Sequence, residues 1–188
     1  MALVDRAKNI LLTPKTEWPK IAEEVETTQS IYVGYVMILA AIGPIAMALR
    51  GGVVGATVAV LTYAITLGVI FLLALIIDAL APNFGAEKNF IQSLKLIAYS
   101  YTAAWVAGIF HLLPFLGGVL GLLAAIYAFY TFYLGVPVMK KCPADKAVAY
   151  TIVVALCAFV LGALIAGSIM TAVVGGAAMG MMGFGMMQ

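Results

Sequence analysis

Five uncharged hydrophobic stretches, each of 18 residues or more, limit the folds that this chain can adopt. They cover residues 31–49, 53–77, 96–113, 115–139 and 147–174. The hydrocarbon core of a bilayer is about 30 Å thick, which about 20 apolar helical residues can cross. The runs are continuous rather than alternating, so they indicate helices, which pair their backbone polar groups inside lipid. The sequence therefore predicts an all-α, polytopic membrane protein with a bundle of five transmembrane helices.

Composition supports lipid rather than water as the surrounding solvent. Charged residues make up only 10% of the chain and hydrophobic residues 65%, whereas about a quarter of the residues in a soluble domain are charged. The net charge of +2 is too small to predict nucleic-acid binding. The first 30 residues carry nine charges and resemble no cleavable signal peptide, so the first stretch is expected to act as an uncleaved insertion signal.

The positively charged residues predict the orientation of the chain. Nine of the ten Lys and Arg residues lie in the N-terminal segment and in the second and fourth connections, which five crossings place on one side. Arg50 alone lies on the other side. By the positive-inside rule, the N-terminus is expected inside and the C-terminus outside. The short connections at residues 50–52 and around Leu113 and Pro114 should each close an antiparallel helical hairpin.

The residues before the first stretch predict short amphipathic helices at the cytoplasmic membrane interface. Apolar residues recur at helical spacing from Leu3 to Leu11, with Arg6 assigned to the opposite, polar face. A second short helix is expected after Pro14, with Trp18 as an interfacial anchor. Packing of both helices against the bundle is an open alternative. The predicted domains are a cytoplasmic amphipathic segment (1–30), a five-helix transmembrane domain (31–174) and a Gly/Met-rich extracytoplasmic tail (175–188).

Two groups of polar side chains near membrane depth are candidates for a functional site. Asp78 and Lys95 are the charges closest to the membrane interior, where ionisable residues are rare and often functional. An orienting ion pair, solvated helix ends, a headgroup contact and a proton or solute path all stay open. Tyrosines of the third and fourth stretches should meet in interhelical hydrogen bonds or around a polar cavity for a ligand. The possible intramembrane polar site comprises Asp78, Lys95, Tyr99, Tyr101, Tyr127 and Tyr130.

The chain carries no grouping that predicts catalysis or a bound cofactor. It has no nucleotide-binding loop, no nucleophile–base pair and no carboxylate pair. His111 is the single histidine, and the two cysteines, Cys142 and Cys157, lack a paired metal spacing. We therefore expect a non-enzymatic protein without a metal site. Copper handling by soft thioether ligands is an alternative, and a flexible apolar end is the other. The methionines concerned are Met170, Met179, Met181, Met182, Met186 and Met187.

The connection between the fourth and fifth stretches carries a family motif. It runs from Leu134 through Gly135, Val136, Pro137, Val138, Met139 and Lys140, and continues through Pro143, Lys146-Ala147 and Tyr150-Thr151. This motif resembles the signature of the Yip-domain family, which is named for proteins that interact with Ypt/Rab GTPases. Upstream, Pro14, Trp18 and Ile21 resemble the N-terminal segment of prokaryotic members. The resemblance implies a five-span protein of a prokaryotic cytoplasmic (inner) membrane.

The charge asymmetry, the loop motif and the lack of catalytic groupings together favour a protein that organises membrane or recruits partners through its basic cytoplasmic face. Membrane lipids, a membrane-protein partner or a second copy are the candidate partners. Eukaryotic relatives bind small GTPases, but their long N-terminal region and their acidic-aromatic-glycine-proline motif have no clear counterpart here, so GTPase binding is not expected. Lys140, Lys141, Lys146 and Trp18 are the candidate lipid or partner contacts, although the lysines could serve topology alone. A small transporter or channel, gated by Asp78 and Lys95, is the alternative function.

Overall fold

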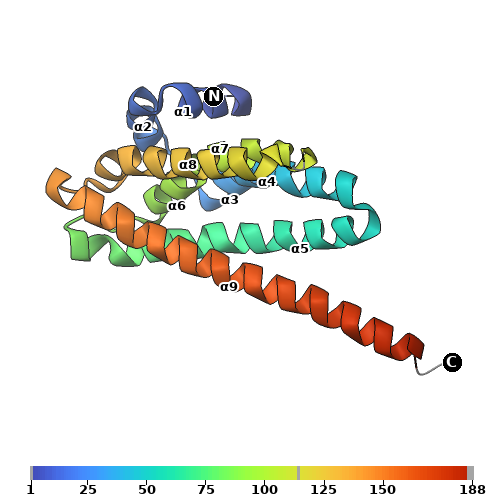
Figure 1. Cartoon of the computed structure of the whole chain (residues 1–188). Helices are drawn as coiled ribbons and strands as arrows, with labels where there is room; N and C mark the ends of the chain where they lie inside the picture. The colour runs from blue at the N-terminus through green and yellow to red at the C-terminus, as the bar shows by residue number, and fades with distance from the viewer. Residues whose placement is uncertain (1, 114, 186–188) are drawn as a thin grey trace. The chain divides into compact units, whose positions relative to one another are not determined.

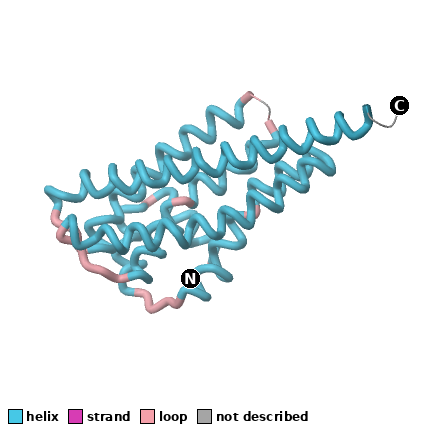
Figure 2. The backbone as a smooth tube through the Cα atoms, turned by 90° about the horizontal axis from the view of Figure 1, so that it is seen from below, coloured by secondary structure: helices cyan, strands magenta, loops and turns pink. Residues whose placement is uncertain are grey.

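The computed structural model describes residues 2–113 and 115–185, and nearly all of them are helical (Figures 1 and 2). No strand occurs in these two ranges, and the helices confirm the predicted all-α class. The elements in chain order are α1 (Leu3–Leu12), α2 (Pro14–Glu23), α3 (Thr28–Ile31), the π-helical η1 (Tyr32–Val36), α4 (Met37–Ala40), α5 (Ile42–Leu80), the 3-10 helix η2 (Ala81–Phe84), α6 (Phe90–Ser100), α7 (Thr102–Ala107), the 3-10 helix η3 (Gly108–Leu112), α8 (Leu116–Lys140) and α9 (Ala144–Gly185).

The chain divides into two compact units, residues 1–154 and 155–188. The described part of the second unit is the helical continuation of α9 as far as Gly185. The first unit holds all the other elements and the first turns of α9. Within it, the connection from α5 to α6 lies beside the connection from α8 to α9. The two connections are joined by a hydrogen bond in which the backbone N–H of Glu87 donates to the carbonyl oxygen of Lys140 at 2.8 Å. We call this part of the first unit the lysine end.

The predicted hairpin at residues 50–52 is present. Gly52 has φ 58° and ψ −143°, a conformation that side chains with a Cβ rarely adopt, and the helical run reverses there. Tyr63 Oη donates to the carbonyl oxygen of Met37 at 2.9 Å, and Tyr32 Oη donates to that of Leu67 at 2.8 Å. In each pair the two residue numbers sum to about 100, as expected for antiparallel helical segments joined by a turn near residue 50. Figure 1 shows this reversal where α5 turns back on itself.

The third predicted stretch is helical but broken. A regular α-helix ends at Ser100, a second begins at Thr102, and from Gly108 the chain narrows to a 3-10 helix. Hydropathy cannot predict this break, because it averages side chains and not backbone geometry. The segment nevertheless runs antiparallel to α8, since a Cβ on Gly117 would touch Phe110 and one on Gly135 would touch Leu96. The second predicted hairpin is therefore present on both sides of residue 114.

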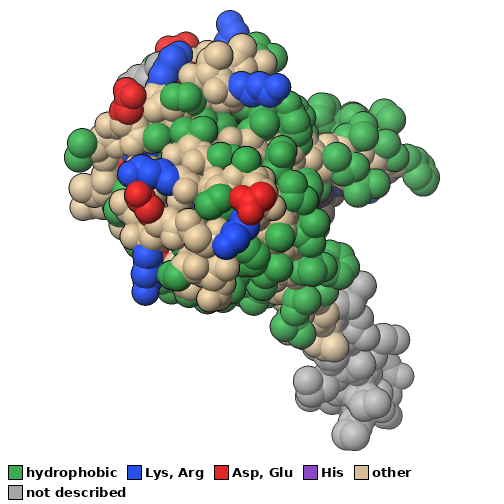
Figure 3. Space-filling model, turned by 90° about the vertical axis from the view of Figure 1, so that its left-hand side faces the viewer, with side chains coloured by type: hydrophobic (Ala, Val, Ile, Leu, Met, Phe, Trp, Pro, Cys, Tyr) green, Lys and Arg blue, Asp and Glu red, His purple; other side chains and the backbone are tan. Residues whose placement is uncertain are grey.

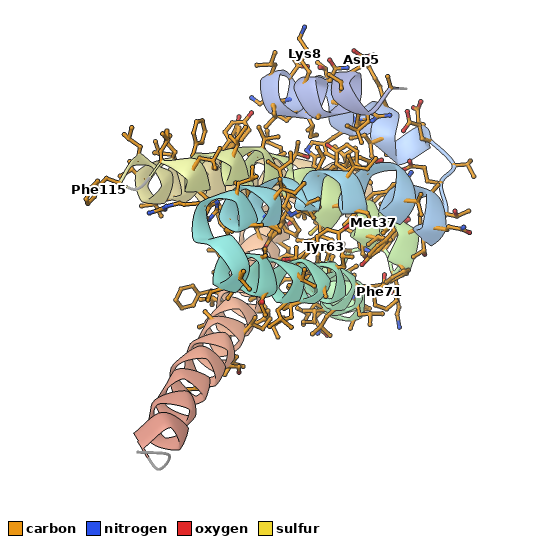
Figure 4. The ribbon with its side chains drawn as sticks, turned by 90° about the vertical axis from the view of Figure 1, so that its right-hand side faces the viewer. Asp5, Lys8, Met37, Tyr63, Phe71 and Phe115 are labelled. Atoms are coloured by element: carbon orange, nitrogen blue, oxygen red, sulfur yellow. The ribbon has the colours of Figure 1, made fainter. Side chains whose placement is uncertain are left out.

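Within the described ranges, three helical runs are long and apolar enough to cross a membrane. They cover Thr28–Phe84, which includes the reversal at Gly52, Leu116–Lys140 and Ala144–Ser168. The broken segment at residues 90–112 contains no such helix, so the count of five crossings stays a prediction. Large apolar side chains cover the outside of the first unit. Val53, Val60 and Phe115 are 85%, 68% and 93% exposed, and Figure 4 shows Phe115 projecting from the helices. So much exposed apolar surface is typical of contact with lipid.

The N-terminal helices α1 and α2 pack against the bundle, which was one of the two alternatives. Ala7 and Ile10 of α1 are buried, and so are Trp18 and Ile21 of α2. The assignment of Arg6 to the polar face was wrong, because Arg6 is only 5% exposed. It lies one turn before Ile10, so the helical period places it on the buried face. Figure 4 shows Asp5 and Lys8 on the opposite side of α1, turned away from the other helices.

Candidate functional site

Lys140, the last residue of α8, is fully buried and held by three acceptors. Its Nζ lies 3.1 Å from Asp78 Oδ1, 3.1 Å from the carbonyl oxygen of Asn89 and 2.7 Å from Ser93 Oγ. An ammonium group has three N–H donors, and this arrangement uses all of them. Lys140 therefore fastens α8 to the end of α5 and the start of α6. It does not contribute to an exposed basic surface, where the sequence analysis had placed it.

Lys95 forms a second buried junction, with the N-terminal segment. Its Nζ donates to the carbonyl oxygen of Ile21 at 2.8 Å and to that of Glu24, and lies 3.8 Å from Glu26 Oε2. The carbonyl of Ile21 belongs to the last turn of α2, where carbonyls lack helical partners and attract cations. Asp78 and Lys95 thus belong to two separate ion pairs. The structure does not bring them together as the pair, or gate, that was considered from the sequence.

Arg6 joins α1 to α2 through two carboxylates. Its Nη1 donates to Glu17 Oε1 at 2.6 Å, and its Nη2 donates to Glu24. Glu17 is fully buried and also accepts from Lys20 Nζ at 3.2 Å, so its charge is balanced where it is buried. The guanidinium carbon of Arg6 lies 5.7 Å from the centre of the Tyr99 ring. The network therefore ties both N-terminal helices to α6.

A cavity of about 160 Å³ lies beside this network. It is lined by Leu3, Arg6, Glu24, Glu26, Ser30, Gly34, Tyr35 and Tyr99. Tyr99 Oη donates to the Glu26 carboxylate, 3.1 Å from each oxygen, and Tyr35 Oη shares a 2.7 Å hydrogen bond with Thr102 Oγ1. The two tyrosine rings meet edge to face, with centroids 4.6 Å apart. Tyr99, one of the residues predicted for an intramembrane polar site, therefore lines a cavity.

The other predicted tyrosines have different neighbours. Tyr127 Oη donates to the carbonyl oxygen of Leu11 at 2.6 Å, and so anchors the end of α1 on α8. Tyr130, which is 42% exposed, lies beside Tyr127 with ring centroids 5.9 Å apart. Tyr101 packs near Trp105, with centroids 6.1 Å apart. None of these three tyrosines lines the cavity at Tyr99.

Trp18 is fully buried against α8 rather than exposed at an interface. Its indole N–H donates to the carbonyl oxygen of Thr131 at 3.1 Å. The ring fills a notch at Gly135, where a Cβ would lie 2.7 Å from Trp18 Cε2 and 2.6 Å from Leu96 Cδ1. Real Cβ atoms essentially never make such contacts. Gly135 of the family motif is therefore explained by the tryptophan of the N-terminal segment.

Three lysines at the lysine end are exposed, and we call them the lysine face: Lys88, Lys141 and Lys146. Lys141 Nζ lies 2.9 Å from the Glu87 carboxylate, in an ion pair exposed to solvent. Among the described residues, Lys88 and Lys146 have no ion pair. Figure 3, which looks at this side of the molecule, shows Lys, Arg, Asp and Glu side chains interspersed over it, with apolar side chains along the flank. Lys141 and Lys146 are thus exposed, and their contact with lipid or a partner stays a prediction.

In the described part of the chain, the cysteine and histidine side chains do not form a metal site or a reactive thiol centre. Cys142 is buried, its Sγ lies 3.6 Å from the carbonyl oxygen of Phe84, and burial raises the pKa of its thiol. No three His, Cys, Asp or Glu side chains of the described residues gather to hold a metal ion. Met186 and Met187 lie outside the described residues, and so do the side chains of the other tail methionines, which are Met170, Met179, Met181 and Met182.

The motif residues after α8 also serve the lysine end. Tyr150 of α9 donates its hydroxyl to the carbonyl oxygen of Ile77, and its ring stacks on Phe84 with centroids 4.8 Å apart. A Cβ on Gly85, which has φ 67°, would lie 3.6 Å from Pro143 Cγ. Apolar helices with exposed flanks and buried ionic junctions at one end define a helical membrane protein.

The comparison with family models identifies the family to which this membrane protein belongs. The model of the Yip1 domain matches residues 8–167, and the chain belongs to the Yip1 family. This is a membrane-trafficking family rather than an enzyme family. The resemblance found in the motif from Leu134 to Thr151 is thereby confirmed. Searches of curated proteins and of solved structures returned no match.

Proposed function

We propose that this Yip1-family protein is a non-enzymatic organiser of the membrane that attracts anionic lipid headgroups or acidic partner surfaces through its lysine face. The proposal rests on the observation that some lysines of the first unit are buried in ion pairs whereas others are exposed. Lys95 and Lys140 are buried in ion pairs that fix the helix ends, whereas Lys88, Lys141 and Lys146 point outward from the same ends. Glu26 and Asp78 thus pair with the buried lysines and stabilise the helix packing. The ammonium groups of the exposed lysines can interact with a partner.

The strength of this attraction follows from the number of cations. A lysine close to an anionic membrane surface gains about 1 kcal/mol. Glu87 offsets part of the charge of Lys141, so Lys88 and Lys146 contribute most. Two such cations gain about 2 kcal/mol, which corresponds to an enrichment of at most roughly thirtyfold for an anionic headgroup over a neutral one. The attraction should weaken as salt is added, because exposed charges are screened over a distance of about 8–10 Å.

The triple variant Lys88→Ala/Lys141→Ala/Lys146→Ala tests this role. We expect it to retain several-fold less phosphatidylglycerol or cardiolipin than the parent protein in native mass spectrometry, and to lose any partner protein that copurifies with the parent. The matched control is the triple Lys→Arg variant, which preserves the charges and should behave like the parent. Arg50→Ala removes a cation elsewhere and should also change nothing. Equal lipid and partner retention by the alanine variant and the parent would contradict the proposal.

We further propose five crossings of a prokaryotic cytoplasmic membrane, with the N-terminus inside and the C-terminus outside. The hairpin at Gly52, and the antiparallel run of residues 90–112 beside α8, support an arrangement in which both lysine-bearing connections share one side. The positive-inside rule assigns that side to the cytoplasm. The broken segment would then cross as a discontinuous helix, which is tolerated where neighbouring helices bury it.

Single cysteines can test this topology in a Cys142→Ala/Cys157→Ala background. We expect Lys88→Cys and Lys141→Cys to react with a membrane-impermeant maleimide only after the cells are lysed, and Arg50→Cys to react in intact cells. All three positions are exposed, so accessibility within the protein does not limit the reaction. Labelling of Lys88→Cys and Lys141→Cys from opposite sides would refute the five-crossing arrangement.

A further inference from the structure

We propose that the cavity beside α1 binds the primary ammonium group of an aminophospholipid headgroup. The cavity has a volume of about 160 Å³ and lies between the first turn of α1, the 24–34 segment, and Tyr35 and Tyr99. One water molecule needs only roughly 10–15 Å³ of such space. The cavity is therefore large enough for a small headgroup, and its lining indicates which kind.

The charges of the lining favour a cation. The cavity is bordered by two carboxylates, Glu24 and Glu26, and by one guanidinium, Arg6. Among the buried charges that pair with this set, Glu17 and Lys95 offset each other. Lys20 also pairs with Glu17, but its side chain is 57% exposed and its charge is screened by solvent, so the buried part of the network keeps an excess of one negative charge. An ammonium group brought between the two carboxylates would neutralise this excess. An anion such as a free phosphate would increase it.

The hydrogen-bonding capacity of the lining points to a donor-rich ligand. One carboxylate oxygen of Glu24 accepts a hydrogen bond from Arg6. No donor among the described residues reaches the second oxygen. Glu26 accepts from Tyr99 and retains lone pairs, because a carboxylate can accept about four hydrogen bonds. A primary ammonium group supplies three N–H donors for such acceptors. A quaternary ammonium group carries the same charge but supplies none.

The two tyrosines add a second feature suited to a cation. Tyr35 and Tyr99 both line the cavity, and the Arg6 guanidinium already lies over the Tyr99 ring. Aromatic faces attract cations through the negative potential of their π-systems. Carboxylates and aromatic rings at one small cavity are thus two independent reasons to expect an ammonium group.

The rim of the cavity favours a lipid over a dissolved amine. Leu3 and Gly34 belong to its lining, and Val33, beside Gly34 in the chain, is 58% exposed. Met37, one turn after Val33, is also exposed, and Figure 4 shows it on the helices below α1. The charged side of α1, with Asp5 and Lys8, faces away from these helices. An acyl chain can therefore lie on the apolar surface while its headgroup enters the cavity.

The experiment compares lipids with identical acyl chains in nanodiscs that hold the purified protein. Native mass spectrometry measures the lipid retained after release. We expect phosphatidylethanolamine to be retained roughly tenfold more than phosphatidylcholine, which carries the same net charge, because one charge-assisted hydrogen bond contributes a factor of this order. Equal retention of the choline lipid would overturn the proposal. Competition by glycerophosphoethanolamine at the concentrations at which the lipid binds would show that the source is a free amine, and would overturn the lipid assignment.

Two variants connect the preference to this cavity. Gly34→Leu should remove it, because a Cβ at Gly34 meets no atom within 4 Å and the side chain has space to fill the cavity. Gly68→Leu is the matched control, since Gly68 is equally open but does not line the cavity. Glu26→Gln keeps an acceptor for Tyr99, removes the charge and should also abolish the preference. An unchanged preference in both Gly34→Leu and Glu26→Gln, with thermal unfolding like that of the parent, would refute the site. The lysine-face variant should keep the preference, so this site and the proposed function can fail separately.

Discussion

Replacement of Lys140 by methionine is expected to lower the free energy of unfolding by about 3–5 kcal/mol, the usual cost of removing one partner of a buried ion pair. Asp78 would keep only its contact with Ser93 Oγ, at 3.3 Å, and the carbonyl oxygen of Asn89 would lose a donor. Both groups lie where α5, α6 and α8 meet. The measurement is unfolding in detergent micelles during titration with a denaturing detergent, followed by circular dichroism.

Two controls separate the buried ion pair from a general effect of losing a lysine. Lys141→Met removes the next residue, whose ion pair with Glu87 is exposed and should contribute less than about 1 kcal/mol. The double variant Lys140→Met/Asp78→Leu removes both charges and should recover most of the loss, because apolar side chains can replace a buried pair at little cost. If Lys140→Met and Lys141→Met destabilise the protein equally, the structural role assigned to Lys140 is wrong.

The difference between these neighbours shows where sequence reasoning stops. Both lysines follow the same hydrophobic stretch, and a hydropathy profile treats them alike. The helix α8 continues through Lys140, whose side chain therefore follows the helical period into the bundle. Lys141 has φ 47° and ends the helix, so its side chain leaves in another direction. The assignment depends on the exact helix end, which composition and periodicity locate only to within a few residues.

The helices and reversals were predictable because lipid imposes a strong rule. Residues in contact with hydrocarbon must be apolar, so most of the charged residues lie near the helix ends and in the connections between the helices. The hairpin at Gly52 follows directly from that pattern. The break between Ser100 and Thr102 was not predictable, because it depends on local hydrogen bonds such as the one from Thr102 Oγ1 to the carbonyl oxygen of Tyr99, at 2.6 Å.

The cavity residues were only partly predictable. Tyr99 was suggested by its place among polar residues in an apolar stretch, whereas Arg6, Glu24 and Glu26 were not proposed as site residues. One signal was present for Arg6, which lies at positions i+3 from Leu3 and i−4 from Ile10, on the apolar face of α1. The glutamates gave none, because exposed and buried carboxylates look alike in a charged segment. Only the folding of that segment onto α6 brings them to Tyr99.

The second large effect is expected where Trp18 packs into α8. Trp18→Ala should lower the free energy of unfolding by about 3–5 kcal/mol, through loss of a fully buried ring and the cavity left behind. The ring also donates to the carbonyl oxygen of Thr131, which would lose this partner. The same denaturing-detergent titration measures the effect. An interfacial anchor would behave differently, since a tryptophan in contact with lipid leaves no cavity when it is shortened.

The glycine opposite the ring gives a test with opposite signs at two positions of one helix. Gly135→Ala should destabilise the protein by about 1–3 kcal/mol, because its new methyl group meets Trp18 and Leu96 in a packed core. Gly121→Ala meets no atom within 4 Å and should be neutral or stabilise α8 by up to about 1 kcal/mol, the helix preference of alanine over glycine. In the double variant Trp18→Ala/Gly135→Ala, the methyl group enters the space left by the ring, so the two losses should be clearly less than additive. Strict additivity, or equal effects of the two glycine substitutions, would show that Trp18 does not occupy this notch.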